Sequence, residues 1–400
     1  MPNAVPIAIL SALFGVAPVA GGARGELASK PGSGVRASAS AMSNVPAAAR
    51  MKMVRNGAEW HASFAPYAPN AIWNRPMTNQ RTPLLLANSA AIVARAEADN
   101  DGRVVWLTGW GAGWDEGHPV YIARETDPVV KVECTTYCDA AHPSQIHIPV
   151  DARPGDGGDA HITVIQPDGS EFDTWATKQP GRDWQTGDTI SSRTAVSCGN
   201  FYSGVGFLNR EGAATVGGAC LAGGLIRAAE LEAGRINHAL FTTVDCATRS
   251  YYVYPAQQPF DSQCTGSGPD LPNGAHLWLD LNDGQVNALP VTSWEKTILR
   301  ALHRYGAYVL DSGSGSDRAH GLFSPWFEDD AQFTALGVPN PMVAFARRAG
   351  WNRIAIPPHD GRFRSAYRYA FTDSWRPLDA IGGWRAHMHV VDPCYARGRC

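Results

Sequence analysis

Two carboxylates and an indole alternate along one short stretch of the chain, in the order Glu171, Asp173 and Trp175. If the stretch is a β-strand, the three side chains project from one face, because successive side chains of a strand point to opposite faces. At a rise of about 3.3 Å per residue, the two carboxyl groups start about 6.6 Å apart. That separation lies in the range that glycoside-cleaving enzymes use for a pair of acids. The stretch therefore predicts carbohydrate chemistry, with Trp175 as a platform for a sugar ring. The alternative is that both acids lie on the solvated face of an antiparallel sheet.

The same stretch resembles part of the Glu-x-Asp-x-x-Glu signature of the jelly-roll, laminarinase-type glucanases. In that family the first Glu is the nucleophile, the Asp assists it and the last Glu is the general acid and base. The resemblance implies the first two roles for Glu171 and Asp173. Trp175 and Ala176 stand where the last Glu is expected, so a general acid must come from elsewhere in the chain.

Other residues are candidates to complete such a site. Asp159 just precedes the first strand of a predicted hairpin. The strand that ends at Asp280 carries His276, Trp278 and Asp280 on one face, which makes a second strip of acid and indole. If the two strips face each other across a concave sheet, Asp173 and Asp280 flank a groove lined by both indoles. The alternative for the second strip is an edge strand that ends in a turn at Asp280.

Two more residues join the list of candidates. His238 lies on a strand face that is otherwise apolar, where a core histidine is commoner than a catalytic one, but its pKa near neutrality suits an acid or a base. Trp184 is a further aromatic candidate for binding a sugar ring. His387 and His389 have the spacing of two metal ligands, but no third ligand accompanies them. We therefore predict neither a metal nor a cofactor.

A polysaccharide lyase is the main alternative to a hydrolase. Uronate lyases with jelly-roll sheets use a Gln-Ile-His strand, an Arg-bearing strand and a Tyr, and the chain resembles them at Gln145–His147 and at Arg193. Tyr121, Tyr202 or Tyr254 would supply the phenol, whereas the Tyr-x-Lys-x-Gly strand of that family is absent. A non-catalytic carbohydrate-binding or cell-wall protein is the third alternative, because aromatic strips serve binding as well as catalysis.

The composition is typical of a turn-rich β protein. The 400 residues include 41 Gly, 28 Pro and 13 Trp, whereas only 18% are charged, which argues against a helical bundle. The 34 basic and 37 acidic residues leave a formal charge of -3, which gives no basic field for nucleic acid. We expect a polysaccharide or oligosaccharide as partner, no nucleic acid, no membrane after signal removal, and a monomer.

The N-terminal region predicts export. Residues 5–19 are apolar and too short to span a bilayer, as in a secretory signal peptide. We predict a signal peptide over 1–22, a disordered linker over 23–56, a folded domain over 57–393 and a C-terminal tail over 394–400. The mature chain is then extracellular.

Eight cysteines in an oxidising compartment predict disulfides. Each cysteine has a near neighbour, so we expect neighbours to pair, although the sequence leaves the connectivity open. No Cys-x-x-Cys pair supports zinc instead. The expected pairs are Cys134 with Cys138, Cys198 with Cys220, Cys246 with Cys264, and Cys394 with Cys400.

Predicted strands occur along most of the chain, in β-branched runs separated by Gly, Pro and Asp. A turn at 167–170 predicts a hairpin of 161–166 with 171–177. Thr292 and Glu295 have the spacing of a capping box, which predicts a helix over 294–305. Because strands occur on both sides of every candidate boundary, we predict an all-β fold with minor helices. The expected architecture is a single jelly-roll-like β-sandwich with helices packed at its side.

From about residue 70 to 310 the chain resembles a group of uncharacterised secreted bacterial β-rich proteins. The features that carry the resemblance are Ile-Pro-x-Asp-Ala-x-Pro at 148–154, the acid before the Trp of the opening strand, Ala-Gly-Gly-Leu-Ile at 222–226, Ile-Asn-His-Ala-Leu at 236–240, Cys246 with Cys264, Leu-Asp at 279–280 and Arg-Tyr-Gly at 304–306. The resemblance implies one long domain and no particular activity.

Overall fold

The structure is a computed structural model, which describes residues 65–77, 83–99, 107–108, 117–155, 159–178, 180–208, 213–244, 247–260, 269–312, 323–328, 341–356, 366–372 and 375–398. The chain divides into two compact units, residues 1–40 and 41–400, and all described residues belong to the second. The predicted signal peptide and linker, and the predicted pair of Cys246 with Cys264, lie outside the described residues.

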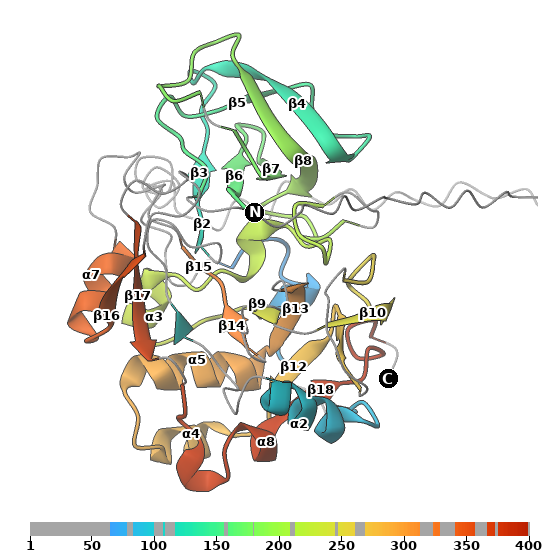
Figure 1. The fold of residues 1–400 in the computed structure, drawn as a ribbon, viewed down its shortest axis with the longest axis vertical. Coiled ribbons are helices and arrows are strands. Elements are labelled where there is room, and N and C mark those ends of the chain that lie inside the picture. Colours follow the sequence, from blue (N-terminus) through green and yellow to red (C-terminus); the bar gives the residue numbers. More distant parts are fainter. Residues whose placement is uncertain are drawn as a thin grey trace, which may run out of the picture. The chain divides into compact units, whose positions relative to one another are not determined.

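Most of the described strands belong to two larger sheets (Figure 1). The six-stranded sheet has the order β3-β6-β7-β8-β4-β5 and the five-stranded sheet the order β14-β9-β13-β12-β18. The strands of the first are β3 (Val120–Ile122), β4 (Val129–Cys138), β5 (Gln145–His147), β6 (Ile162–Ile165), β7 (Ser170–Trp175) and β8 (Thr189–Asn200). Those of the second are β9 (Leu240–Val244), β12 (His276–Leu279), β13 (Ala307–Ser312), β14 (Ser324–Pro325) and β18 (Met388–Val391).

Smaller sheets of the orders β1-β17-β16, β10-β11 and β15-β2 complete the described strands. Their strands are β1 (Leu107–Thr108), β2 (Gly117–His118), β10 (Ala247–Tyr252), β11 (Leu271–Asn273), β15 (Phe327–Glu328), β16 (Asn352–Ile356) and β17 (Ala366–Thr372). Parallel pairs, such as β4 with β8 and β9 with β13, occur beside antiparallel ones. The predicted β-rich class is therefore confirmed, whereas the jelly-roll connectivity is not confirmed and stays a prediction.

The predicted hairpin is confirmed by β6 and β7, which pair antiparallel with Thr163 opposite Asp173. Gly169 closes the turn with a φ of 85°, a conformation that favours glycine. The strand β7 alternates as predicted. Phe172 packs in a core cluster on one face of the sheet, and Trp175 packs against a different cluster. That second cluster joins the two larger sheets, since it contains Val196 of β8 and Phe241 of β9.

The described helices are α2 (Ser89–Asp99), α3 (Ala228–Ala233), α4 (Asp283–Ala288), α5 (Ser293–Arg304), α7 (Pro341–Arg348) and α8 (Trp384–His387), with 3-10 turns η2 (Ile72–Asn74), η4 (Leu221–Gly224) and η5 (Asp379–Ile381). The predicted capping box of α5 is confirmed, with Thr292 as its N-cap and Glu295 as its reciprocal partner. The helix packs its buried stripe on β12 (Figure 1). No helix among the described ranges is both long enough and apolar enough to cross a bilayer.

Two of the expected disulfides are present, Cys134 with Cys138 and Cys198 with Cys220. Cys394 is also disulfide-bonded, while Cys400 lies outside the described residues. These bonds are consistent with an extracellular protein, because disulfides persist in oxidising environments.

Candidate functional site

The two acids of β7 are fully buried, because Glu171 and Asp173 are both 0% exposed. The alternative of a solvated sheet face is therefore wrong, and so is the expectation that these carboxylates line an open groove. They face η4 instead, whose sequence Leu221–Gly224 lies against this side of β7.

Each buried acid is held by one hydroxyl group and one backbone N–H group. The Tyr67 hydroxyl donates to Glu171 Oε2 (2.8 Å), and the N–H of Ala222 donates to Oε1 (3.2 Å). Thr163 Oγ1 donates to Asp173 Oδ1 (2.5 Å). The backbone N–H of Leu221, the first residue of η4, donates to Asp173 Oδ2 (2.9 Å). All four carboxyl oxygens are thus accounted for without a cation.

Burial raises the pKa of both acids. The pKa of Asp173 rises to about 7, and that of Glu171 rises well above its ordinary value. The hydrogen bond between the two carboxyl groups raises the pKa of Glu171 further and lowers that of Asp173. Both carboxyl groups are therefore harder to ionise than free ones, as expected for close carboxyl groups buried away from water.

Glycine allows η4 to approach the acids closely. A Cβ at Gly224 would lie 2.2 Å from the ring of Phe241, and a Cβ at Gly223 would lie 2.8 Å from the ring of Tyr67. Contacts this short do not occur between real side chains, so only glycine fits both positions. The two glycines of the Ala-Gly-Gly-Leu-Ile sequence at 222–226 therefore have a packing role beside the acid pair.

The buried acids also lie beside a disulfide. The ligand atoms of Glu171, Asp173, Cys198 and Cys220 all lie within 4.8 Å of one another. The two sulfurs are bonded to each other, and it is the free thiolate that ligates metals. With the disulfide closed, the group offers only two carboxylates, whose oxygens already accept hydrogen bonds from the protein, and it does not fit a metal ion.

A cleft of about 710 Å³ lies beside Trp175, at the end of β7. Its lining comes from both larger sheets and from the loops between them. The lining residues are Thr136, Tyr137 and Cys138 of β4, Asp159, Trp175, Thr194 of β8, Ala213 to Val216, Gln258, Pro259, and Asp311 and Ser312 of β13. Of the acids predicted for catalysis, this set contains Asp159 alone.

Trp175 makes three defined contacts in this cleft. Its Nε1 donates to Asp159 Oδ1 (2.7 Å). The guanidinium of Arg193 lies over its ring, 4.5 Å from the centroid. The ring of Tyr137, which is 57% exposed, lies 6.3 Å away between centroids at an angle of 41°. The indole therefore carries an arginine on its ring, and the exposed aromatic surface of the cleft is Tyr137. Sequence reasoning missed Tyr137, because it stands in no recognisable motif.

A disulfide fixes the segment that carries Tyr137. The pairing of β4 with β8 shifts register between Cys134 and Tyr137, as at a β-bulge. The Cys134–Cys138 bond closes this irregular segment. The bond therefore limits the positions that the Tyr137 ring can take at the mouth of the cleft.

The second predicted strip does not face the first. Trp278 is 5% exposed, and its Nε1 donates to the carbonyl of His303 (2.8 Å). Asp280 is exposed and follows β12 in the five-stranded sheet, whereas Asp173 lies in the six-stranded sheet. The predicted groove between the strips was wrong, because α5 covers this part of β12 and makes Trp278 a core residue.

His276 is also a core residue. Its ring stacks on Tyr308 at 4.1 Å, and its Nε2 bonds to the carbonyl of Tyr305 (2.8 Å). Burial lowers its pKa to about 4, although the bond to Tyr305 acts in the opposite direction. The prediction that His276 binds substrate was therefore wrong.

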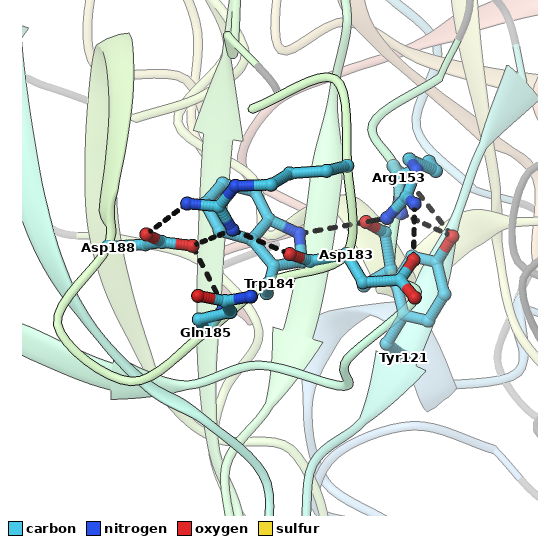
Figure 2. Close-up of polar contacts among 8 residues, drawn as sticks. Tyr121, Arg153, Asp183, Trp184, Gln185 and Asp188 are labelled. Atoms are coloured by element: carbon cyan, nitrogen blue, oxygen red, sulfur yellow. Dashed lines mark hydrogen bonds and ion pairs between the residues drawn. The ribbon is translucent and has the colours of Figure 1, made fainter.

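Trp184 belongs to a structural network of polar contacts (Figure 2). It is 1% exposed, and its Nε1 donates to the carbonyl of Ala152 (2.8 Å). Beside it Arg153 forms an ion pair with Asp183 (2.9 Å) and shares two 3.0 Å hydrogen bonds with the Tyr121 hydroxyl. The predicted role of Trp184 in sugar binding was wrong, because its ring has no exposed face.

His238 lies in a buried ionic network. Its Nε2 lies 3.0 Å from Glu230 Oε1, and Arg227 Nη2 lies 2.6 Å from the same oxygen. Burial alone would raise the pKa of Glu230, but the positive charges of Arg227 and His238 lower it to about 2. The Arg227 side chain is 2% exposed, and those of Glu230 and His238 are at most 1% exposed, so the network holds α3 in the core. His238 does not line the cleft beside Trp175, and its catalytic role stays a prediction.

The residues that resemble those of a uronate lyase do not lie together in one site. In β5, Gln145 pairs opposite Lys131, which in turn pairs with Thr189 of β8. Arg193 lies four residues further along β8, which is about 13 Å at the rise of a strand. Tyr121 is buried and bonded to Arg153.

These features define a class: a β-rich, disulfide-bonded protein with an aromatic cleft that contains carboxylates. No family model, no curated protein and no solved structure matches the chain. The geometry of the cleft therefore has to support any function by itself.

Proposed function

We propose that this chain binds a saccharide in the cleft beside Trp175. The observation that carries the proposal is the lining of the cleft, which places an exposed tyrosine ring beside two carboxylates and several hydroxyl groups. A sugar ring has an apolar face that packs on an aromatic side chain and hydroxyl groups that need hydrogen-bond acceptors. Tyr137 offers the aromatic face, while Asp159 and Asp311 offer acceptors.

The volume of the cleft agrees with this ligand class. Ligand sites in proteins usually measure about 300 to 1,000 Å³ and combine aromatic surface with a few polar groups. The cleft of about 710 Å³ lies within that range. Secretion, predicted from the N-terminus and supported by the disulfides, would place the cleft where polysaccharides occur. The predicted jelly-roll connectivity belongs to the same proposal.

Hydrolysis of a glycosidic bond is a second candidate, favoured by one observation. Asp159 and Asp311 reach the same cleft from different elements, the segment before β6 and the strand β13. A pair of carboxylates on either side of a bound sugar is the minimum that glycoside hydrolysis requires. Glu171 and Asp173 do not line this cleft, since both are fully buried.

The test is a panel of polysaccharides with the purified chain, read by pull-down, by new reducing ends and by the absorbance of unsaturated uronates. Binding that is lost in Tyr137→Ala but kept in Tyr252→Ala would support the proposal. Tyr252 is a matched control, because it is also about half exposed and does not line the cleft.

The same panel separates binding from cleavage. New reducing ends that disappear in Asp159→Asn and in Asp311→Asn would support hydrolysis. Unsaturated products would favour a lyase instead. Retained binding without either product would leave the chain a carbohydrate-binding protein. Binding that is unchanged in Tyr137→Ala would overturn the proposed site.

A further inference from the structure

Arg193 stacks on two rings that line the cleft, those of Trp175 and Tyr137, and its charge has no partner among the described residues. The residue is exposed on β8, next to Thr194, which lines the cleft. No carboxylate among the described residues lies within ion-pair distance of it, whereas Arg153 and Arg182 each pair with an aspartate. Its guanidinium is nevertheless held in place by two rings.

Two aromatic rings lie close to this guanidinium. It lies over Trp175 at 4.5 Å from the ring centroid and 5.7 Å from the centroid of Tyr137. Stacking on aromatic faces orients the planar group and leaves its N–H edges free to donate. The hydrogen bond from Trp175 to Asp159 holds the indole in place, so the ring on which the guanidinium stacks is itself positioned. The result is an arginine held against two rings that line a saccharide-sized cleft.

We infer that Arg193 forms an anion subsite and that the saccharide bound by the cleft carries a negatively charged group. This inference rests on the proposed function and names the substrate class. The matching chemistry is a planar or tetrahedral oxyanion that accepts two parallel hydrogen bonds, as a carboxylate or a sulfate ester does.

The position of the acids agrees with this assignment. Asp159 accepts from the indole Nε1 at the ring edge, whereas Arg193 lies over the ring face. The cleft therefore separates an acceptor side, suited to sugar hydroxyl groups, from a donor side suited to an anion. A neutral sugar would fill the first and leave the arginine without a partner.

The experiment compares oligogalacturonate, its fully methyl-esterified form and a sulfated oligosaccharide of similar length, by calorimetric titration with the whole chain. The ester matches the acid in shape and lacks the charge, so the difference between them reports the anion subsite. We expect the acid to bind about 10- to 100-fold more tightly than the ester, as for one charge-assisted hydrogen-bonded pair. A preference for the sulfated probe over the carboxylate would assign the subsite to sulfate esters.

Arg193→Gln should remove the preference for the charged probe, so that the acid and the ester bind with about equal affinity. Arg193→Lys keeps the positive charge but loses the planar guanidinium that stacks on the rings and donates two parallel hydrogen bonds. This variant should therefore keep only part of the preference for the charged probe. Arg182→Gln is the control for net charge, because that arginine is exposed and pairs with Asp188 away from the cleft.

The outcomes distinguish the inference from the proposed function. Equal binding of acid and ester, lost in Tyr137→Ala, would overturn the anion subsite while the saccharide site stands. A preference for the acid that persists in Arg193→Gln would also overturn it. Failure of every saccharide to bind would overturn the proposed function and the inference with it.

Discussion

Trp175 donates its indole N–H to Asp159 at 2.7 Å, so the aromatic ring and an acid of the cleft form one unit. The two residues are brought together by the hairpin of β6 and β7, since Asp159 stands just before the first strand and Trp175 ends the second. The N–H of Ala176 donates to the backbone carbonyl of Asp159 as well. A change in either side chain should therefore alter both.

This unit predicts different effects for two substitutions of Asp159. Asp159→Asn keeps an oxygen acceptor for the indole, so the affinity for saccharide should change by only a few fold. Asp159→Leu leaves the indole N–H without its partner and should weaken binding by about tenfold or more, as expected for roughly 1–3 kcal/mol. Titration of both variants with one saccharide checks the difference. Equal affinities would show that the hydrogen bond does not position Trp175.

The hydrogen bonds from Tyr67 and Ala222 predict the effect of substitutions at the buried Glu171. Gln has the shape of the protonated acid and can bond to Tyr67 and Ala222, so Glu171→Gln should lower the free energy of unfolding by about 1 kcal/mol or less. Glu171→Leu leaves the Tyr67 hydroxyl and a backbone N–H unpaired, and should lower it by about 2–4 kcal/mol. Urea denaturation measures both. If the two variants were equally stable, the buried hydrogen bonds would not contribute as described.

The raised pKa of Asp173 predicts how stability depends on pH. The pKa is about 7 in the folded chain against 3.8 for the ordinary group, so the folded state binds more protons than the unfolded state between these values. The contribution to stability is complete below pH 3.8 and is lost as the pH rises through about 7. The unfolding free energy should decrease by a few kcal/mol over this window.

Asp173→Asn isolates this contribution, because an amide cannot titrate. The difference in unfolding free energy between wild type and variant should slope downward from about pH 4 to about pH 7 and be flat beyond it. Asp280→Asn is the control, since this aspartate is exposed. Parallel curves for wild type and Asp173→Asn would contradict the pKa of the buried acid.

The Cys134–Cys138 bond predicts a link between redox state and binding. Replacing both cysteines with serine frees the segment that carries Tyr137, and should weaken saccharide binding several fold. The closed loop is short, so the free energy of unfolding should fall by only about 2 kcal/mol. Binding and melting of the double variant test this, and affinity equal to wild type would show that Tyr137 is positioned without the disulfide.

Local signals in the sequence predicted local structure well. The hairpin of β6 and β7 follows from a Pro-Asp-Gly-Ser turn between two runs of strand formers. Helix α5 follows from its capping box and apolar stripe. The neighbouring cysteines that the structure describes also pair as expected. In each case the residues that decide the structure lie within a few positions of one another.

The candidate site was harder to predict, because burial depends on elements far apart in the sequence. Alternation placed Glu171 and Asp173 on one face correctly, but η4, some fifty residues later, covers that face. Helix α5 covers Trp278 in the same way. The cleft itself combines Tyr137 with Asp311, and no local pattern joins residues at such a separation.

The cleft is lined by strands of two different sheets, β4 and β8 on one and β13 on the other. A ligand that fills the cleft would therefore contact both sheets at once, and it would favour the unfolding of the two sheets in a single cooperative step. At one hundred times its Kd, such a ligand stabilises the folded chain by about 2.7 kcal/mol. If the chain binds a saccharide as proposed, it would resist unfolding and proteolysis best where that saccharide is abundant.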